Sequence, residues 1–387
     1  MSYNAKLVFD TYRIMEFRDL KRQYQVLKND IDKAMTDVAT SGGYIMGKAV
    51  TELETELATY VGTPHCMTCA NGTDALTIAL KVWGIGAGDA VFVPDFTFFA
   101  SAEVIALEGA TPIFVDVDKD TFNLDPQSLK DAIKAVKDEG ILTPKVVIAV
   151  DLFGLPANYP AIKEIVLQEG LLLLEDGAQG FGGSIGEKRA CSFGDIATTS
   201  FFPAKPLGCY GDGGALFTDN EEWATLISSY RFHGKGSYKY DNVRIGLNSR
   251  LDTLQAAILQ VKFKAFQTSE LQDVNAAAQY YTTHLKGATL PSVAAPFHSS
   301  WAQYTLRLDK EETRNALQQK LKSENIPSMV YYPTPMSQQT AFKGAKRYIS
   351  TPNSQELSQT VLSLPIHPYI TQQELDNVID CVNRFLK

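Results

Sequence analysis

The residues best suited to chemistry in this sequence are one lysine and one acidic residue upstream of it. Asp176 ends the apolar run Leu171–Glu175, which predicts a buried strand, and Lys205 follows a second strand-like run, Ile196–Phe202. Two parallel strands that end at one edge of a sheet would bring both side chains to the same crevice. A lysine amine can form a Schiff base with an aldehyde, and a carboxylate can keep a pyridine nitrogen protonated so that the ring accepts electrons. The pair therefore predicts a site for pyridoxal phosphate (PLP).

Both residues also have ordinary explanations, because a lone lysine is usually exposed and an acidic strand end can face solvent. The flanking segments Phe201–Pro203 and Pro206–Gly208 are apolar and rigid, which suits a desolvated amine better than a solvated one. The four leucines that precede Glu175 argue against a fully exposed Asp176. Gln179 follows three residues later, and its amide could hydrogen-bond the ring hydroxyl.

A candidate phosphate-binding segment, Cys69–Asp74, precedes the helical run Ala75–Lys81. Gly72 lets the backbone approach an anion, and the amide of Thr73 would point outward at a helix N-terminus, where the helix dipole favours negative charge. A plain capped helix start explains the same segment. Ser200, near the end of the second strand-like run, could donate a hydrogen bond to the same phosphate.

Two further segments carry weaker signals. Phe98 lies just past a predicted strand, Ala90–Val93, and could stack on a planar ring, although an aromatic residue there is more often part of the core. The polar loop Gly246–Arg250 precedes a helix and could offer an amide and a guanidinium to an anionic ligand.

Composition limits the class of protein. The chain has 387 residues, of which 45% are hydrophobic and 21% charged, so it is long enough for two domains and a large core. The formal net charge of -8 argues against a nucleic-acid-binding face. The five cysteines are few and odd in number, which favours a reducing cytoplasm over a disulfide framework. Cys66 and Cys69 form a CxxC without a second pair, which favours structural thiols over a metal or redox site.

Several other site classes lack support. No apolar run approaches the roughly 18 residues that span a bilayer, and the polar residues 1–14 predict an extension rather than a signal peptide. Gly180–Lys188 is not a phosphate-binding Walker loop, because Glu187 interrupts the required Gly-Lys-Ser/Thr. No G-x-G-x-x-G follows a strand, and no His-x-x-x-His pair is present, so we expect neither a dinucleotide site nor a metal.

The order of predicted elements indicates an α/β fold. Strands rich in Val, Ile and Leu alternate with helical stretches up to about residue 270, which predicts a mainly parallel sheet covered on both faces. The predicted strands are Ala90–Val93, Pro112–Val117, Val146–Val150, Leu171–Glu175, Ala197–Phe201 and Ala215–Thr218. A smaller C-terminal α+β domain should follow, with strands Trp301–Leu308 and Ser328–Tyr332 and helices Glu311–Ser323 and Thr371–Leu386. We expect domains at 15–270 and 271–387.

Together these segments resemble the sugar-nucleotide aminotransferases of the DegT/StrS type, a branch of the fold-type I PLP enzymes. The resemblance runs from Met15–Leu20 to the final helix, and its most specific parts are Ser200–Gly214 and Gly246–Ala257. Leu362–Tyr369 fits the same group. The resemblance implies a seven-stranded sheet and a homodimer whose active site is shared between subunits. It also implies a keto-sugar-nucleotide substrate and L-glutamate as amino donor, with no nucleic acid or membrane partner.

The resemblance also implies roles for single residues. Lys205 would bind the PLP aldehyde and later shuttle a proton, Asp176 would pair with the pyridine nitrogen, and Gln179 would contact the ring hydroxyl. Thr73 and Ser200 would hold the phosphate. Asn248 would reach the phosphate of the partner subunit, and Arg250 would bind a substrate carboxylate.

Within this family the chain is most similar to enzymes that aminate a UDP-linked 3-keto N-acetylglucosaminuronic acid for surface polysaccharides, such as the O-antigen of lipopolysaccharide. Two departures stand out. The usual Asp-Ala-Ala-Gln reads Asp176–Gln179 with glycine at 177, and the usual His-Tyr-Pro is Tyr331–Pro333. Tyr331 and Tyr332 are expected near the sugar, so the second departure bears on the substrate.

Two alternatives stay open at this point, and one is disfavoured. A 4-keto sugar or a dTDP carrier stays open, whereas a dehydratase of the same fold is disfavoured, because such enzymes carry histidine where this chain has Lys205. The other open alternative is a PLP-binding or sugar-nucleotide-binding protein without turnover, such as a regulator, which would need a DNA-binding module that the sequence does not show.

Overall fold

The computed structural model describes residues 15–238 and 240–387. The expected extension, residues 1–14, therefore lies outside the described residues. The strands are β1 (His65–Cys69), β2 (Asp89–Pro94), β3 (Thr111–Val115), β4 (Thr143–Val150), β5 (Leu172–Asp176), β6 (Ser184–Ile185), β7 (Lys188–Arg189), β8 (Ile196–Ser200), β9 (Gly214–Thr218), β10 (Phe297–His298), β11 (Tyr304–Arg307) and β12 (Val361–Leu364). The α-helices are α1 (Leu20–Ser41), α2 (Lys48–Val61), α3 (Gly72–Val82), α4 (Ala100–Leu107), α5 (Pro126–Glu139), α6 (Tyr159–Glu169), α7 (Glu221–Tyr230), α8 (Thr253–Ala265), α9 (Leu271–His284), α10 (Glu311–Ser323), α11 (Pro352–Thr360) and α12 (Gln372–Phe385).

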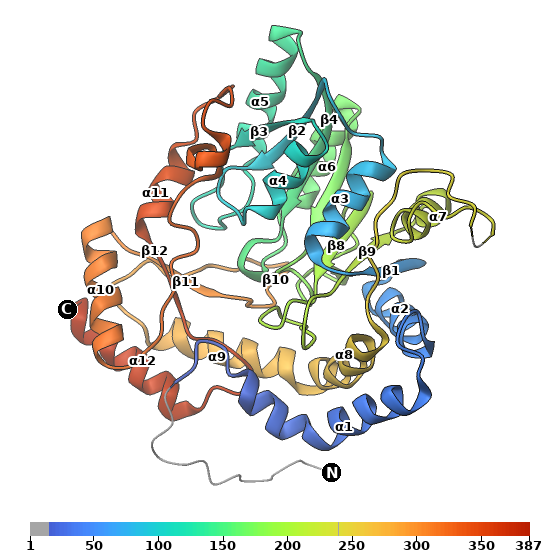
Figure 1. Cartoon of the computed structure of the whole chain (residues 1–387). Helices are drawn as coiled ribbons and strands as arrows, with labels where there is room; N and C mark the ends of the chain where they lie inside the picture. The colour runs from blue at the N-terminus through green and yellow to red at the C-terminus, as the bar shows by residue number, and fades with distance from the viewer. Residues whose placement is uncertain (1–14, 239) are drawn as a thin grey trace.

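A seven-stranded sheet forms the centre of the fold, with the strand order β1-β9-β8-β5-β4-β2-β3 (Figure 1). Strands β8, β5, β4, β2 and β3 pair in parallel, whereas β9 runs antiparallel to both of its neighbours. The predicted mainly parallel α/β sheet is thus confirmed. Because β5 and β8 are parallel neighbours, their last residues, Asp176 and Ser200, lie at the same edge of the sheet.

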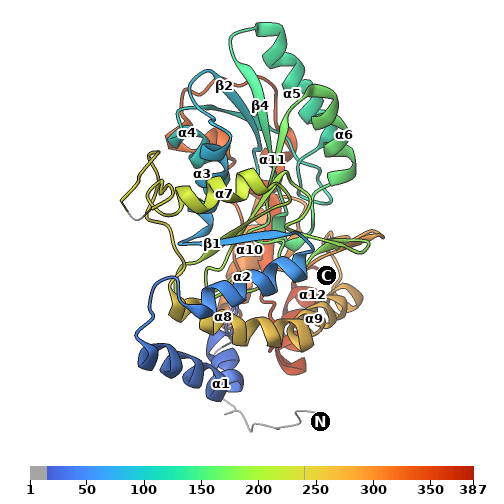
Figure 2. The ribbon, with the colours of Figure 1, turned by 90° about the vertical axis from the view of Figure 1, so that its right-hand side faces the viewer.

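Helices cover both faces of this sheet (Figure 2). Along β2, Val91 and Val93 pack in the same core as residues of α3, α4 and α7. Ala90 and Phe92, on the opposite face, pack with α5 and α6, while α2 and α8 cover the part of that face formed by β1, β8 and β9. Successive strand residues point to opposite faces, so a strand buried on both sides reads as a continuous apolar run.

A second core lies in the C-terminal part of the chain. Strands β11 and β12 form an antiparallel pair, and side chains of α9, α10 and α12 pack with them. Met15, the first described residue, belongs to this core as well. The expected division after residue 270 falls at the end of the π-helical segment Phe266–Glu270, which joins α8 to α9. The domain boundary itself stays a prediction.

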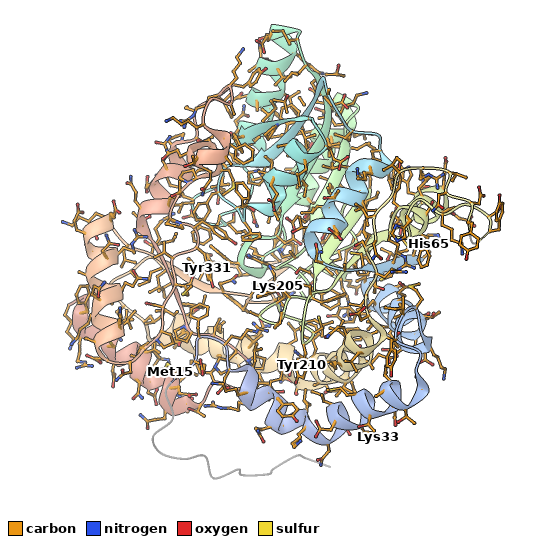
Figure 3. The ribbon with its side chains drawn as sticks, in the orientation of Figure 1. Met15, Lys33, His65, Lys205, Tyr210 and Tyr331 are labelled. Atoms are coloured by element: carbon orange, nitrogen blue, oxygen red, sulfur yellow. The ribbon has the colours of Figure 1, made fainter. Side chains whose placement is uncertain are left out.

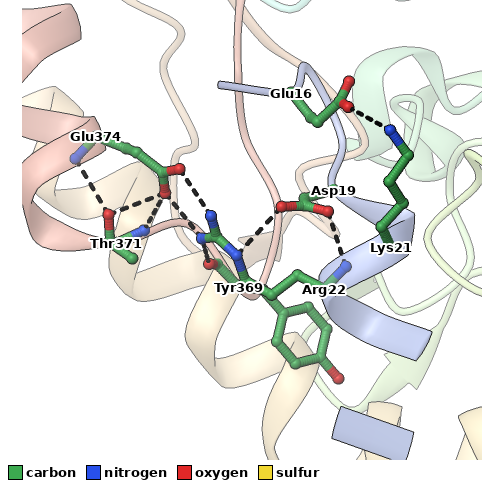
Figure 4. Close-up of polar contacts among 7 residues, drawn as sticks. All are labelled: Glu16, Asp19, Lys21, Arg22, Tyr369, Thr371 and Glu374. Atoms are coloured by element: carbon green, nitrogen blue, oxygen red, sulfur yellow. Dashed lines mark hydrogen bonds and ion pairs between the residues drawn. The ribbon is translucent and has the colours of Figure 1, made fainter. Parts of the chain in front are cut away.

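Arg22 in α1 ties the N-terminal helix to the C-terminal part of the chain (Figure 4). Its guanidinium donates hydrogen bonds to Glu374 (Nη2 to Oε1, 2.8 Å) and to the carbonyl of Tyr369 (2.5 Å), and its Nε lies 3.1 Å from a carboxylate oxygen of Asp19. Glu374 also completes a capping box with Thr371 at the start of α12. Charge-assisted bonds of this kind hold a side chain in one geometry, so residues 15–19 are fixed against the C-terminal part.

Two strand predictions differ from the structure near the C-terminal part. The predicted strand Ser328–Tyr332 is wrong, because only Met329 pairs, in an isolated bridge with Ser363. Prolines at 327 and 333 flank this stretch, and proline cannot donate to a strand ladder. The predicted strand Trp301–Leu308 is shortened to β11, since Trp301 has a φ of 50° and lies outside extended geometry.

Sequence periodicity also missed one strand of the main sheet, β1. Its residues His-Cys-Met-Thr-Cys lack the Val and Ile that signal strands, and it forms only by pairing with β9. The helix predictions did better: α10 has the predicted bounds, and α12 is one residue shorter at each end than predicted because Thr371 is its N-cap. No α-helix in the described ranges is long and apolar enough to cross a membrane.

Candidate active site

Nine of the predicted site residues line one cavity of about 490 Å³ at the edge where β5 and β8 end. They are Gly72, Thr73, Phe98, Asp176, Gln179, Ser200, Lys205, Tyr331 and Tyr332. Lys205 lies near the centre of the molecule, between the sheet above it and the helices below it in the view of Figure 3, with Tyr331 on the side of the C-terminal part. The cavity therefore lies between the sheet edge and the C-terminal part of the chain.

Asp176 is the last residue of β5 and is only 4% exposed. Ser101 in α4 donates a hydrogen bond to its Oδ2 (2.7 Å), and the backbone amide of Ala178 donates to its Oδ1 (3.2 Å). Burial raises the pKa of this carboxyl, while the two hydrogen bonds and the charge of Lys205 oppose the rise. A carboxylate in this position is stabilised further by a cation in the cavity, such as a protonated pyridine nitrogen.

Lys205 is held in a tight loop after β8. Its backbone amide donates to the carbonyl of Phe202 (2.8 Å), and a Cβ on Gly208 would lie 2.6 Å from that same carbonyl oxygen. Burial lowers the pKa of the Lys205 amine, Asp176 opposes this decrease, and the nearby guanidinium of Arg18 adds to it. The loop thus presents an amine with a larger neutral, nucleophilic fraction than a free lysine has.

The first turn of α3 and the end of β8 form a narrow cradle. Gly72 lies so close to Ser200 that a Cβ at position 72 would be 2.8 Å from the Ser200 Cβ. Asn71 caps α3 by accepting a hydrogen bond from the Asp74 amide (2.7 Å), which leaves the amides of Gly72 and Thr73 without intrahelical partners. The helix cap and the cradle therefore coexist, and this end of the cavity suits a phosphate group.

Gln179 is engaged on both sides of its amide. Its Oε1 accepts a hydrogen bond from the Phe153 backbone (2.6 Å), and its Nε2 donates to the hydroxyl of Tyr332 (3.1 Å). The ring of Phe98 is 53% exposed and lies 6.2 Å from the ring of Tyr332, at an angle of 44°. Phe98 is thus available to a planar ligand, while the contact of Gln179 with a ring hydroxyl would use its second amide hydrogen and stays a prediction.

Asn248 and Arg250 lie outside this cavity. They line a second cavity of about 450 Å³, in which Arg250 donates to the side-chain oxygen of Asn248 (2.5 Å) and lies over the ring of Phe232, 4.7 Å from its centre. Asp212 lines both cavities, so the two are adjacent. Within one chain neither residue joins the set around Lys205, and their predicted roles stay predictions.

The glycine at 177, a departure from the usual family segment, has a local physical reason. A Cβ at this position would lie 2.7 Å from the sulfur of Cys191 and 3.0 Å from the carbonyl oxygen of Thr198. The Cys191 thiol is fully buried and occupies the space that an alanine methyl would need. The contacts of Asp176 and Gln179 are kept, because neither of them involves the side chain at 177.

Four residues around the site were not among the sequence predictions. Ser101 follows the segment that contains Phe98, and its position three residues after Phe98 on a helical turn was the available signal. Arg18 donates a hydrogen bond to the carbonyl of Pro206 (3.3 Å), although about 190 residues separate them and nothing in the sequence links them. Asp212 and Gln303 also line the cavity; they lie within Ser200–Gly214 and the predicted strand Trp301–Leu308, but neither was assigned a role in the site.

The residues around the cavity fit PLP. A cradle that a Cβ at position 72 would close, a desolvated lysine and a buried carboxylate surround the same space. They correspond to the phosphate, the aldehyde and the pyridine nitrogen of this cofactor.

Known proteins agree with this interpretation. Residues 25–383 match the model of the DegT/DnrJ/EryC1/StrS aminotransferase family. The UDP-2-acetamido-2-deoxy-3-oxo-D-glucuronate aminotransferase of Pseudomonas aeruginosa is 44% identical over 92% of this chain and 96% of its own length.

Solved structures share the fold. A DegT/DnrJ/EryC1/StrS aminotransferase from Brucella abortus superposes with a TM-score of 0.93 at 46% identity, covering 96% of this chain and 99% of its own. NtdA from Bacillus subtilis, solved with bound cofactor PMP, the amino form of PLP, has a TM-score of 0.85 at 26% identity, covering 99% of this chain and 87% of its own. The chain therefore belongs to the DegT/DnrJ/EryC1/StrS aminotransferase family, as its motifs indicated, and it is an aminotransferase with PLP as its cofactor.

Proposed function

We propose that this enzyme transfers the amino group of L-glutamate to the 3-keto carbon of a UDP-linked 2-acetamido-2-deoxy-3-oxoglucuronic acid. The observation that carries the proposal is the 44% identity, over nearly the whole length of both chains, to the P. aeruginosa enzyme of that name. The cavity supports it, since Lys205, Asp176 and the phosphate cradle form a complete set for PLP chemistry beside open space for a substrate. The product would serve surface polysaccharide synthesis, such as that of the O-antigen.

PLP, when bound, acts as an electron sink that allows an amino group to move between two carbon skeletons. Gly72, Thr73 and Ser200 would hold its phosphate, and Phe98 would cover a face of its ring. The buried carboxylate of Asp176, which Ser101 orients, would keep the ring nitrogen protonated, because the two opposite charges stabilise each other in the buried site.

Lys205 has a second task as the base. Once its amine is free, its depressed pKa leaves a larger neutral fraction that accepts a proton from the α-carbon of glutamate. In the second half-reaction, after the keto acid has left, the same amine would deliver a proton to the sugar carbon that receives the amino group. The tight loop holds the amine in place, so this proton transfer is effectively intramolecular.

A second copy of the chain is part of this proposal. Asn248 and Arg250 line a cavity that adjoins the PLP cavity through Asp212 but does not open onto Lys205 within one chain. In a homodimer Asn248 of one subunit would reach the phosphate held by the other, and Arg250 would offer a guanidinium to a substrate carboxylate. All five cysteines are free, which supports a reducing, cytoplasmic location.

The first experiment is an absorbance spectrum of the purified protein before and after addition of L-glutamate. We expect a band near about 410–430 nm that shifts to about 330 nm with L-glutamate and is missing in Lys205→Ala. Coupled assays with UDP-linked and dTDP-linked keto sugars then test the acceptor. A protein that binds no added PLP would contradict the proposed catalysis. A protein that does not react with glutamate but reacts with another amino donor would contradict the proposed donor.

A further inference from the structure

The C-terminal part of the chain contributes three residues to the wall of the PLP cavity: Gln303, Tyr331 and Tyr332. The phosphate cradle, Asp176 and Lys205 all come from the opposite side, at the sheet edge. The wall formed by the C-terminal part is therefore the one that faces a substrate placed over the cofactor. Gln303 is the only amide among these three side chains.

The side chain of Gln303 has no hydrogen-bond partner within the described ranges, and its Oε1 is buried. Its neighbour Gln179 differs, because both ends of that amide are engaged, by Phe153 and Tyr332. Buried polar groups are almost always paired in folded proteins, so the buried, unpaired Oε1 of Gln303 at the cavity wall calls for a partner from outside the chain.

The backbone holds Gln303 firmly in this position. Its amide nitrogen donates to the carbonyl of Phe153 (3.3 Å), and the Ser300 hydroxyl donates to the carbonyl of Gln179 (2.8 Å). Ser300 also packs closely against Gly154, since a Cβ on Gly154 would lie 2.5 Å from the Ser300 hydroxyl. The segment is thus fastened to the same turn that positions Gln179, so the backbone that carries the Gln303 side chain is fixed at the cavity wall.

We propose that the Gln303 amide binds the acylamino substituent of the sugar next to the carbon that is aminated. A primary amide donates and accepts at once, which matches the N–H and carbonyl of an acylamino group. The rings of Phe98, Tyr331 and Tyr332 line the same cavity and suit the acyl methyl group. This inference rests on the proposed function, in which the sugar carries an acetamido group beside the reacting carbon.

The test runs the sugar half-reaction backwards, because an aminated sugar nucleotide converts bound PLP to its amino form and shifts the absorbance. Holoenzyme is mixed with L-glutamate, with UDP-linked 2-acetamido-3-amino-2,3-dideoxyglucuronic acid, or with the analogue that has a hydroxyl in place of the acetamido group. The variants are Gln303→Leu, which keeps the size, and Gln168→Leu, a matched change at an exposed position of α6.

We expect Gln303→Leu to raise the half-saturating concentration of the acetamido compound roughly 10- to 100-fold and to leave glutamate within about twofold. The hydroxyl analogue should lose much less, and Gln168→Leu should behave as wild type. Equal losses with glutamate and both sugars, or no loss at all, would overturn the role of Gln303 and leave the proposed function standing. A wild-type enzyme that reacts with glutamate but with neither sugar would overturn the proposed acceptor, and this inference with it.

Discussion

Ser101 donates a 2.7 Å hydrogen bond to Oδ2 of Asp176 and thereby fixes the buried carboxylate that faces the PLP cavity. The bond comes from the start of α4, on the strand-to-helix connection after β2, and the carboxylate from the end of β5. Thr97 lies 3.2 Å from the Ser101 hydroxyl and extends this contact. The hydrogen bond orients a charge that has lost most of its hydration. This buried charge lowers the stability of the apo fold, whereas the proposed catalysis needs it.

Replacement of Asp176 by asparagine should abolish transamination without harming the apo fold. Burial raises the pKa of Asp176, so folding disfavours its charged form, and the stability that this group contributes at low pH is lost as pH rises through the folded pKa. Asparagine is neutral at every pH, so the apo melting temperature at pH 8 should stay equal or rise, while glutamate-driven conversion falls by at least about 1000-fold.

Thermal unfolding with and without PLP checks this prediction, with Asp131→Asn on the surface of α5 as control. A lower melting temperature of the apo variant would contradict it.

Removal of the Arg18 charge should shift the pH dependence of PLP attachment. Arg18 and burial lower the pKa of Lys205 and Asp176 raises it, so Arg18→Met should move the Lys205 pKa upward. Attachment needs the neutral amine, and its rate in the variant should therefore reach half of its maximum at a higher pH than in wild type. Arg18→Lys, which keeps a cation, should resemble wild type.

The rate is followed by the appearance of the visible absorbance band as PLP is added to apoenzyme between pH 6 and pH 10. A profile for Arg18→Met that is unchanged, or that moves to lower pH, would show that the guanidinium does not act on the Lys205 amine.

A pair of buried carboxyl groups behind the site should respond unequally to neutralisation. Burial raises the pKa of Glu175, and the hydrogen bonds that it accepts from the backbone amides of Cys191 (2.5 Å), Phe193 (2.6 Å) and Gly194 (3.1 Å) oppose this rise. Asp151 is fully buried, and burial together with the charge of Glu175 raises its pKa well above the ordinary range. The Oδ2 of Asp151 has no other hydrogen-bond partner, and when protonated it would donate a hydrogen bond to Glu175.

We therefore expect Asp151→Asn to be tolerated within about 1 kcal/mol and Glu175→Gln to cost about 2–4 kcal/mol, because the second change weakens three amide contacts. The folded pKa of Asp151 is raised, so its contribution is complete at low pH and is lost as pH rises through that pKa. Asp151→Asn should flatten this alkaline decline. Urea unfolding of the apoenzyme from pH 5 to pH 9 measures both effects, and equal costs for the two variants would disprove the shared proton.

Gly177 and Cys191 should be energetically coupled. Gly177→Ala places a methyl group 2.7 Å from the Cys191 sulfur and should destabilise the protein by about 1–3 kcal/mol through overpacking. Adding Cys191→Ala removes the sulfur and should recover part of this loss, leaving the tight contact with the Thr198 carbonyl. A double-mutant cycle measured by urea unfolding gives the coupling, and strict additivity of the two changes would refute it.

The chemistry of this protein could be predicted from the sequence, because short local patterns mark the residues that carry it. Asp176 and Lys205 each follow a strand-like run, and the parallel order of β5 and β8 converts their similar sequence positions into closeness in space. Gly72 and Thr73 needed only a helix start, and the motifs Ser200–Gly214 and Gly246–Ala257 carried the family. Periodicity also predicted α10 and most of the sheet, because both faces of its strands are apolar.

Features that depend on contacts between segments far apart in the sequence could not be predicted from local patterns. Strand β1 forms because β9 offers it a partner, and Ser328–Tyr332 fails to become a strand because prolines flank it and only Met329 finds a partner. The tertiary structure alone brings Arg18 beside Pro206 and leaves the Gln303 amide unpaired at the cavity wall. It alone places Asn248 and Arg250 in a separate cavity. The sequence by itself determined the cofactor chemistry, whereas packing between remote segments decided which further side chains surround it.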